Sequence, residues 1–111
     1  MSELFPETKV VAISKENFDI YIGRKVSHRF EESTFHNPFK IGYDGDRREV
    51  VLLFLEYWYA PERKTLRELA VKELTGKTLG CWCKPLLCHG DIVASYVNWR
   101  NNEDKVQLHI R

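Results

Sequence analysis

In some segments of the chain apolar residues form short runs or alternate with polar ones, which predicts strands, and in others they recur at helical spacing. An apolar run over residues 8–14 predicts a buried strand, and apolar side chains at alternate positions of 18–22 predict a second strand. Residues 78–83 predict a third strand. The alternation of apolar and polar residues in 106–110 predicts a fourth, at the edge of the sheet.

Three other segments have apolar residues at helical spacing. The first covers 46–60, because Asp46 and Glu49 have the spacing of a capping box and a proline follows the segment. The second covers 65–75, from a threonine with a glutamate three residues later to a glycine stop. The third covers 90–99.

The order of these elements predicts one α/β domain over residues 1–111. Strands and helices follow as β-β-α-α-β-α-(β), which favours a small Rossmann-like domain with three to four strands and three helices packed on the sheet. In the first helix Phe54, Tyr57 and Trp58 recur at the spacing of a buried face. We therefore expect them in the core rather than around a ligand.

The amino-acid composition limits which kinds of partner and which cellular location we expect. Seventeen Lys and Arg residues against sixteen Asp and Glu give a net charge of +1, which does not indicate a nucleic-acid partner. The longest apolar run, 50–55, is too short for a membrane span, and residues 1–6 lack the features of a signal peptide. All three cysteines lie within 81–88, unlike a secreted disulfide framework. We expect a cytoplasmic protein.

The strongest candidate site is the predicted passage from the third strand into the third helix. It consists of Gly80-Cys81-Trp82-Cys83-Lys84-Pro85-Leu86-Leu87-Cys88-His89-Gly90-Asp91. A strand that leads into a helix amino terminus is an arrangement by which α/β proteins hold phosphate or carboxylate groups. Free N–H groups of the helix, together with His89, would form an anion cradle beside the accessible backbone of Gly90. The alternative is that the cysteines are small core residues and His89 packs at a helix start.

The same segment contains potential metal ligands, namely Cys81, Cys83, Cys88 and His89. Residues two apart in a regular strand are separated by about 7 Å, whereas sulfurs around tetrahedral zinc are about 3.8 Å apart. Cys81 and Cys83 would share a metal only if the strand ended at Cys81. We therefore expect no metal cofactor and well under one equivalent of zinc, with these four residues as the second choice.

Other candidate residues lie before the first helix. Gly23 and Arg24 end the second strand with a glycine and a fixed cation, which favours either an anion site or a plain surface turn. Residues 24–45 form a long loop, so this loop is either functional or contains a short element. Further ligand-binding candidates in it and just after it are Asn37, Phe39, Asp44, Asp46 and Arg47.

Several of these motifs together resemble domain-of-unknown-function family 4326, whose small domains occur in bacteriophages and bacteria. The resemblance covers about residues 10–98. It is carried by Tyr21-Ile22-Gly23-Arg24, Asn37-Pro38-Phe39, Ile41-Gly42, Asp44-Gly45, Asp46-Arg47 and the run from Leu79 to Asp91. The family name implies no activity. Where the family commonly has Trp-Gly before Asn-Pro-Phe, this chain has Phe35-His36, so its loop is expected to take a different path.

Three functions are compatible with these residues. The first is the binding of a small anionic, nucleotide-derived ligand at the strand–turn–helix site, with hydrolysis of an N-glycosidic or phosphate bond as an open extension. The second is a metal-stabilised interaction module that binds a host protein, as a phage accessory factor would. A thiol redox protein ranks last, because the Cys-x2-Cys redox spacing is absent. Whether the protein is an enzyme stays open at this level.

Overall fold

Three short strands and three α-helices make up the part of the chain that the computed structural model describes, residues 7–110, with side chains over 7–103. The elements are β1 (Lys9–Ala12), β2 (Ile20–Tyr21), α1 (Arg47–Tyr59), the 3₁₀ helix η1 (Pro61–Arg63), α2 (Lys64–Leu74), β3 (Thr78–Cys81) and α3 (His89–Ile110). The prediction of a small α/β domain with three helices is confirmed.

The sheet is parallel, and β3 lies at its centre. Strand order is β1-β3-β2, and both outer strands run parallel to β3. A parallel neighbour requires a long crossover, which α1 and α2 supply between β2 and β3. Gly80 pairs with Val11 on one side and Tyr21 on the other. A side chain at Gly80 would meet the Phe18 ring at 2.6 Å, so the central strand needs a glycine there.

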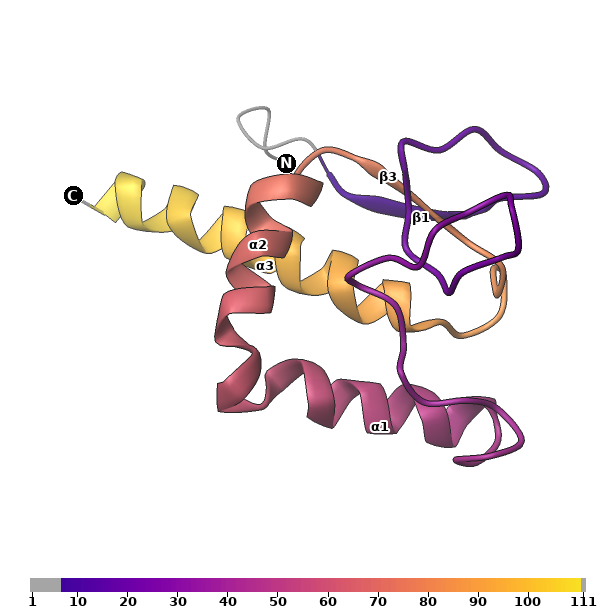
Figure 1. The fold of residues 1–111 in the computed structure, drawn as a ribbon. Helices are drawn as coiled ribbons and strands as arrows, with labels where there is room; N and C mark the ends of the chain where they lie inside the picture. Colours follow the sequence, from indigo (N-terminus) through magenta and orange to yellow (C-terminus); the bar gives the residue numbers. More distant parts are fainter. Residues whose placement is uncertain (1–6, 111) are drawn as a thin grey trace.

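Helix α3 connects the sheet to the other helices. It packs against β1 and also against α1 and α2 (Figure 1). Val93 and Val97 of α3 are fully buried, as are Leu74 of α2 and Leu79 of β3. The predicted aromatic face of α1 is confirmed for Phe54 and Trp58, which are fully buried, while Tyr57 and other partly buried side chains pack against this core.

The start of α1 follows the predicted capping box, whereas the start of α2 does not. The Glu49 N–H donates to Asp46 Oδ1 at 2.9 Å, and the Asp46 N–H donates to Glu49 Oε1 at 2.8 Å. Helix α2, in contrast, begins at Lys64 without a side-chain cap. The 3₁₀ turn that Pro61 starts leads directly into α2, so Thr65 lies inside the helix and has no capping role.

One predicted strand and the predicted end of another are wrong. Residues 106–110 are not an edge strand, because α3 continues to Ile110. No glycine or proline occurs between Trp99 and Ile110, so nothing in the sequence stops the helix there. Strand β3 ends at Cys81 instead of Cys83, because a turn follows in which the Leu86 N–H donates to the Cys83 carbonyl at 2.8 Å.

Among the described residues, none of the helices combines the length and apolar character that a bilayer crossing requires.

The burial of the α1 face gives a stability prediction. Phe54 has no exposed surface, whereas Leu52, two residues away on the same helix, is 48% exposed. Phe54→Ala should lower the free energy of unfolding by roughly 3–5 kcal/mol, because it leaves a cavity in the core. The matched control Leu52→Ala should cost under about 1 kcal/mol. Chemical denaturation measures both, and similar values for the two variants would refute the assignment of Phe54 to the core.

Candidate ligand-binding cavity

A cavity of about 510 Å³ opens where β2 and β3 end. Its walls come from the residues after β2, the loop between β2 and α1, the first turns of α1, the turn after β3 and the start of α3. Its lining residues are Tyr21, Gly23, Arg24, Lys25, Val26, Asn37, Phe39, Lys40, Ile41, Tyr43, Arg47, Val50, Val51, Cys81, Trp82, Cys83, Leu87, Cys88 and His89. Its volume lies within the range of about 300–1,000 Å³ that is typical of small-molecule sites.

Most of the residues predicted to bind a ligand come together in this cavity. They are Gly23, Arg24, Asn37, Phe39, Arg47, Cys81, Trp82, Cys83, Cys88 and His89, while Asp44, Asp46, Gly90 and Asp91 do not line it. The long loop, residues 24–45, forms one wall, and two isolated bridges within it, Val26 with Phe30 and Ile41 with Gly45, are the only pairings that it makes as β-structure in the described chain.

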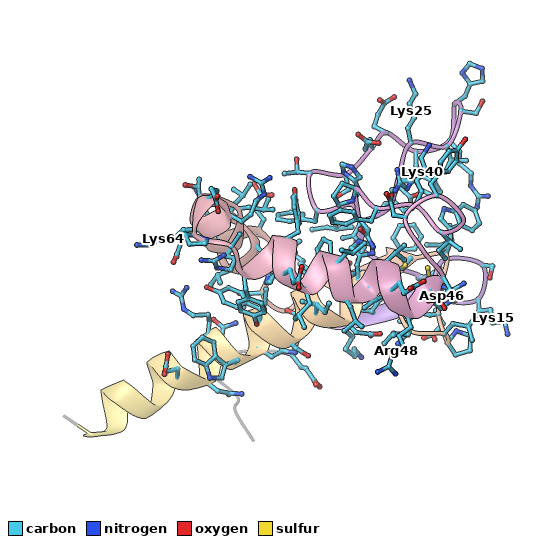
Figure 2. The ribbon with its side chains drawn as sticks, turned by 90° about the horizontal axis from the view of Figure 1, so that it is seen from below. Lys15, Lys25, Lys40, Asp46, Arg48 and Lys64 are labelled. Carbon is cyan, nitrogen blue, oxygen red and sulfur yellow. The ribbon has the colours of Figure 1, made fainter. Side chains whose placement is uncertain are left out.

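The charge of the cavity is one-sided. Arg24, Lys25, Lys40 and Arg47 line it, and no Asp or Glu is among its described lining residues. Figure 2 shows Lys25 and Lys40 on the same side of the molecule, on the loop above α1. Arg24 Nη2 is buried and has no hydrogen-bond partner among the described residues. A buried guanidinium N–H without an acceptor is costly, so an anion that accepts this hydrogen bond would be stabilised.

Aromatic side chains form the apolar part of the cavity wall. Tyr21 stacks on Phe30 with ring centroids 4.2 Å apart. Its hydroxyl accepts a hydrogen bond from Trp82 Nε1 at 3.0 Å and donates to the Arg24 carbonyl at 2.6 Å. Burial raises the pKa of Tyr21, which keeps the phenol protonated as this donor. The bonds hold the Trp82 ring beside the backbone that carries Arg24.

Three thiols and one imidazole lie together at the inner end of the cavity. Cys81 Sγ and Cys88 Sγ are 2.6 Å apart, and Cys88 Sγ lies 3.7 Å from His89 Nδ1. Cys81, Cys88 and His89 are all buried. Cys83 is half-buried, and hydrogen bonds from the Cys81 and Cys88 thiols, followed by one from Arg47, lower the pKa of its thiol. We call Cys81, Cys83, Cys88 and His89 the thiol–imidazole cluster.

His89 has a structural position that the sequence did not predict. Its Nε2 donates to the Ile22 carbonyl at 3.0 Å, and its ring lies edge-on to Phe54 with centroids 5.1 Å apart. Burial lowers the pKa of His89, so the imidazole is neutral at pH 7. The structure therefore gives no support to the predicted role of His89 in an anion cradle, and this role stays a prediction. A neutral ring whose only N–H is already bonded offers an anion neither charge nor a donor.

Two backbone N–H groups at the start of α3 are already bonded to side chains of the protein. The Gly90 N–H donates to Cys88 Sγ at 3.3 Å, and the Cys88 N–H donates to Asp91 Oδ2 at 3.2 Å. These two bonds have the reciprocal form of a capping box, with a thiol in the place of the usual hydroxyl. Asp91 also pairs with Lys84 at 2.9 Å. Asp91 therefore caps the helix and closes the preceding turn.

Gly90 is a packing position and gives no ligand access to the backbone. A side chain there would meet Ile22 Cδ1 at 2.6 Å and Val10 Cγ1 at 3.1 Å. The absence of a side chain lets the first turn of α3 approach the sheet closely.

Three polar candidates hold turns instead of facing the cavity freely. The Asn37 side chain donates to the Val50 carbonyl at 3.2 Å and accepts from the Phe39 N–H at 2.9 Å, which ties the loop to α1. Asp44 accepts the Lys40 N–H at 2.8 Å. Asp46 caps α1, as described above. These contacts fix the backbone on which Phe39 and Lys40 approach the cavity.

Sequence reasoning missed several lining residues, above all Lys25, Lys40 and Tyr43. Two of them had a local signal, because Lys25 directly follows Arg24 and Lys40 directly follows Phe39. The apolar lining residues of α1, Val50 and Val51, had no such signal, since their spacing indicates only a buried helix face.

Comparisons with known proteins cover the same region. The model of a family described as "Domain of unknown function (DUF4326)" matches residues 8–99. The uncharacterized 12.4 kDa protein in the nrdA-td intergenic region of Enterobacteria phage T4 is 33% identical over 92 residues, which cover 81% of this chain and 77% of that protein. No solved structure matches the chain. The family match includes all residues that line the cavity.

The cap at α3 gives the prediction for this region. Asp91→Ala removes the acceptor of the Cys88 N–H and should lower the free energy of unfolding by about 1 kcal/mol. Lys84→Ala is the matched control, because it removes only the partly exposed ion pair with Asp91 and should cost well under 1 kcal/mol. Thermal or chemical denaturation distinguishes them. A larger loss in Lys84→Ala would show that the ion pair, rather than the cap, holds this turn.

Proposed function

Because the chain belongs to the family described as Domain of unknown function (DUF4326), whose name states no activity, we propose from the cavity itself that this protein binds a small anionic, nucleotide-derived ligand. The observation that carries the proposal is the set of four cationic side chains around a cavity whose described lining residues include no carboxylate. Such a one-sided arrangement raises the local concentration of anions and favours phosphate over neutral ligands.

Arg24 and Arg47 would bind the phosphate end of the ligand. Arginine presents several N–H donors in a planar fork that matches two phosphate oxygens, and it stays charged at any physiological pH. Arg24 Nη2 is the donor that lacks a protein acceptor. Lys25 and Lys40, both exposed, would add point charges nearer to solvent.

The aromatic wall would bind a flat ring at the other end. Trp82 is 48% exposed and is held by its hydrogen bond to Tyr21. Phe39, on the loop before α1, also lines the cavity. Stacking on such a ring is tolerant of the identity of a base, since every base has an aromatic face. A ligand with both a phosphate and a base would use both parts of the cavity.

The place of the cavity in the sheet supports the same proposal. In open parallel α/β sheets, ligands bind outside the carboxyl ends of the strands. The cavity lies at the carboxyl ends of β2 and β3, and we propose that the domain is Rossmann-like in this sense. The cytoplasm, where thiols stay reduced and nucleotides are abundant, is the proposed location.

Binding, without hydrolysis, is the function proposed. Cleavage of a glycosidic bond usually needs a carboxylate pair, and the described lining residues contain no carboxylate. His89 is neutral, but its Nδ1 faces a thiol in the buried cluster. The cavity therefore has cationic and aromatic side chains suited to binding, and none of its described lining residues is clearly placed as a general base.

A different observation favours the second candidate function, the binding of a host protein. Tyr43 and Leu87 line the cavity and are 86% and 49% exposed, and Leu86, next to Leu87 in the chain, is 55% exposed. Large exposed apolar side chains are a feature of protein-binding surfaces. Tight capture of a host protein, combined with no binding of any nucleotide, would favour this function over the first.

A nucleotide panel tests the first proposal. Nucleotides, dinucleotides and cyclic nucleotides are screened by thermal shift, and hits are measured by calorimetry. Arg24→Ala and Arg47→Ala should each weaken the binding of a hit at least tenfold, about 1.4 kcal/mol. Arg48→Ala is the matched control, since this exposed neighbour of Arg47 does not line the cavity and points away from Lys25 and Lys40 (Figure 2). Equal effects at Arg47 and Arg48, or no hit in the panel, would contradict the proposal.

A further inference from the structure

We propose that the inner end of the cavity binds a zinc ion. Cys81, Cys88 and His89 are the ligands that the structure brings together, and Cys83, two residues after Cys81, would supply the fourth. All four come from the segment that joins β3 to α3. The inference does not rest on the nucleotide proposal, because its ligand atoms are the sulfurs and the imidazole nitrogen and it is tested without a nucleotide.

The end of β3 removes the geometric argument against a metal. In a regular strand Cys81 and Cys83 would be about 7 Å apart and unable to share an ion. Strand β3 instead stops at Cys81, and the turn that begins at Cys83 reverses the chain. The Cys83 N–H then donates to Cys81 Sγ at 3.5 Å, so the two residues are folded toward each other.

The donor atoms of the buried members lie at the separations that a small ion requires. Those of Cys81, Cys88 and His89 are all within 4.8 Å of one another. The 3.7 Å between Cys88 Sγ and His89 Nδ1 is close to the separation of about 3.8 Å expected for donors around tetrahedral zinc. Cys81 Sγ and Cys88 Sγ, now 2.6 Å apart, would separate to about 3.8 Å around the ion.

His89 is oriented as a zinc-bound histidine is. Ligating histidines almost always donate their second ring N–H to a backbone carbonyl or a carboxylate, which fixes the tautomer and the ring plane. His89 Nε2 donates to the Ile22 carbonyl at 3.0 Å, and this leaves the lone pair of Nδ1 directed toward Cys88 Sγ. The buried ring therefore has its ligating nitrogen on the side of the thiols.

The sulfurs are surrounded by donors that stabilise thiolates. The Gly90 N–H donates to Cys88 Sγ at 3.3 Å, and the Cys83 N–H reaches Cys81 Sγ. Each thiolate of a metal site carries negative charge, which such N–H groups partly offset. Cys81 and Cys88 therefore each have a backbone donor at their sulfur.

Zinc fits this set better than other common metals. Three thiolates and one imidazole in tetrahedral arrangement form a closed structural zinc site. One Zn²⁺ with three thiolates leaves a net charge of −1, which the four cationic side chains around the cavity exceed. The ion would staple the end of β3 to the start of α3. A Cys81–Cys88 disulfide is the competing chemistry, but it would use two of the four donors.

The test measures metal binding directly. Fully reduced protein is titrated with Zn²⁺ and with Co²⁺ in competition with a chromophoric chelator. We expect one equivalent of either ion, a sulfur-to-cobalt charge-transfer band, and a higher thermal midpoint with zinc than with a chelator. Cys83→Ser, at a half-buried position, should keep the fold and weaken zinc binding at least tenfold. His89→Ala should also weaken zinc binding, together with a loss of stability, because the buried ring contacts Ile22 and Phe54. His28→Ala, at an exposed position on the loop, should bind zinc as the unaltered protein does.

Three results would overturn the proposal. The first is no stoichiometric uptake of zinc or cobalt by the folded, reduced protein. The second is zinc affinity unchanged in Cys83→Ser. The third is a Cys81–Cys88 disulfide in protein purified without oxidant, together with no zinc uptake after reduction. Loss of nucleotide binding with intact zinc uptake would reject only the ligand proposal, so the two failures are distinguishable.

Discussion

The arrangement of the cavity depends on the buried imidazole of His89. Its hydrogen bond to the Ile22 carbonyl joins the start of α3 to the end of β2, and its edge-on contact with Phe54 brings α1 to the same point. Gly90 allows this approach, because a side chain there would collide with Ile22. Since β2, α1 and α3 each contribute to the cavity wall, their meeting at one neutral ring determines where the cavity lies. Burial lowers the pKa of the ring and the bond to Ile22 acts in the opposite direction, and burial is the larger effect.

The positive charge of the cavity comes from side chains on the loop and on α1. At the start of α3 the Gly90 N–H is bonded to Cys88 Sγ and the Cys88 N–H to Asp91, so these two donors are not free for an external anion. Positive charge comes instead from arginine and lysine side chains on the loop and on α1. Side chains at the solvent boundary are screened by salt more strongly than buried groups. Binding through them should therefore weaken with ionic strength, and the half-buried Arg24, whose Nη2 is buried, should be least affected.

The three strands, the three α-helices and ten of the nineteen cavity-lining residues were predictable from the sequence, because they depend on local patterns. The capping box of Asp46 and Glu49 and the helical spacing of Phe54 and Trp58 are local features, and both are present in the structure. The direction of a side chain after a turn is not local. Whether β3 ended at Cys81 or Cys83 depended on the turn that follows, and this boundary decided whether the cysteines could meet. The burial of His89 was equally hidden, since it results from contacts with residues far away in the chain.

The central claim is that anions bind among Arg24, Lys40 and Arg47, at the carboxyl ends of β2 and β3. The most direct measurement is a titration of ¹⁵N-labelled protein with the nucleotide panel, followed by amide chemical shifts. The account predicts saturable shifts at these three residues and around Trp82, with α2 unaffected. Shifts that are confined to α2, or shifts that do not saturate with any member of the panel, would contradict it.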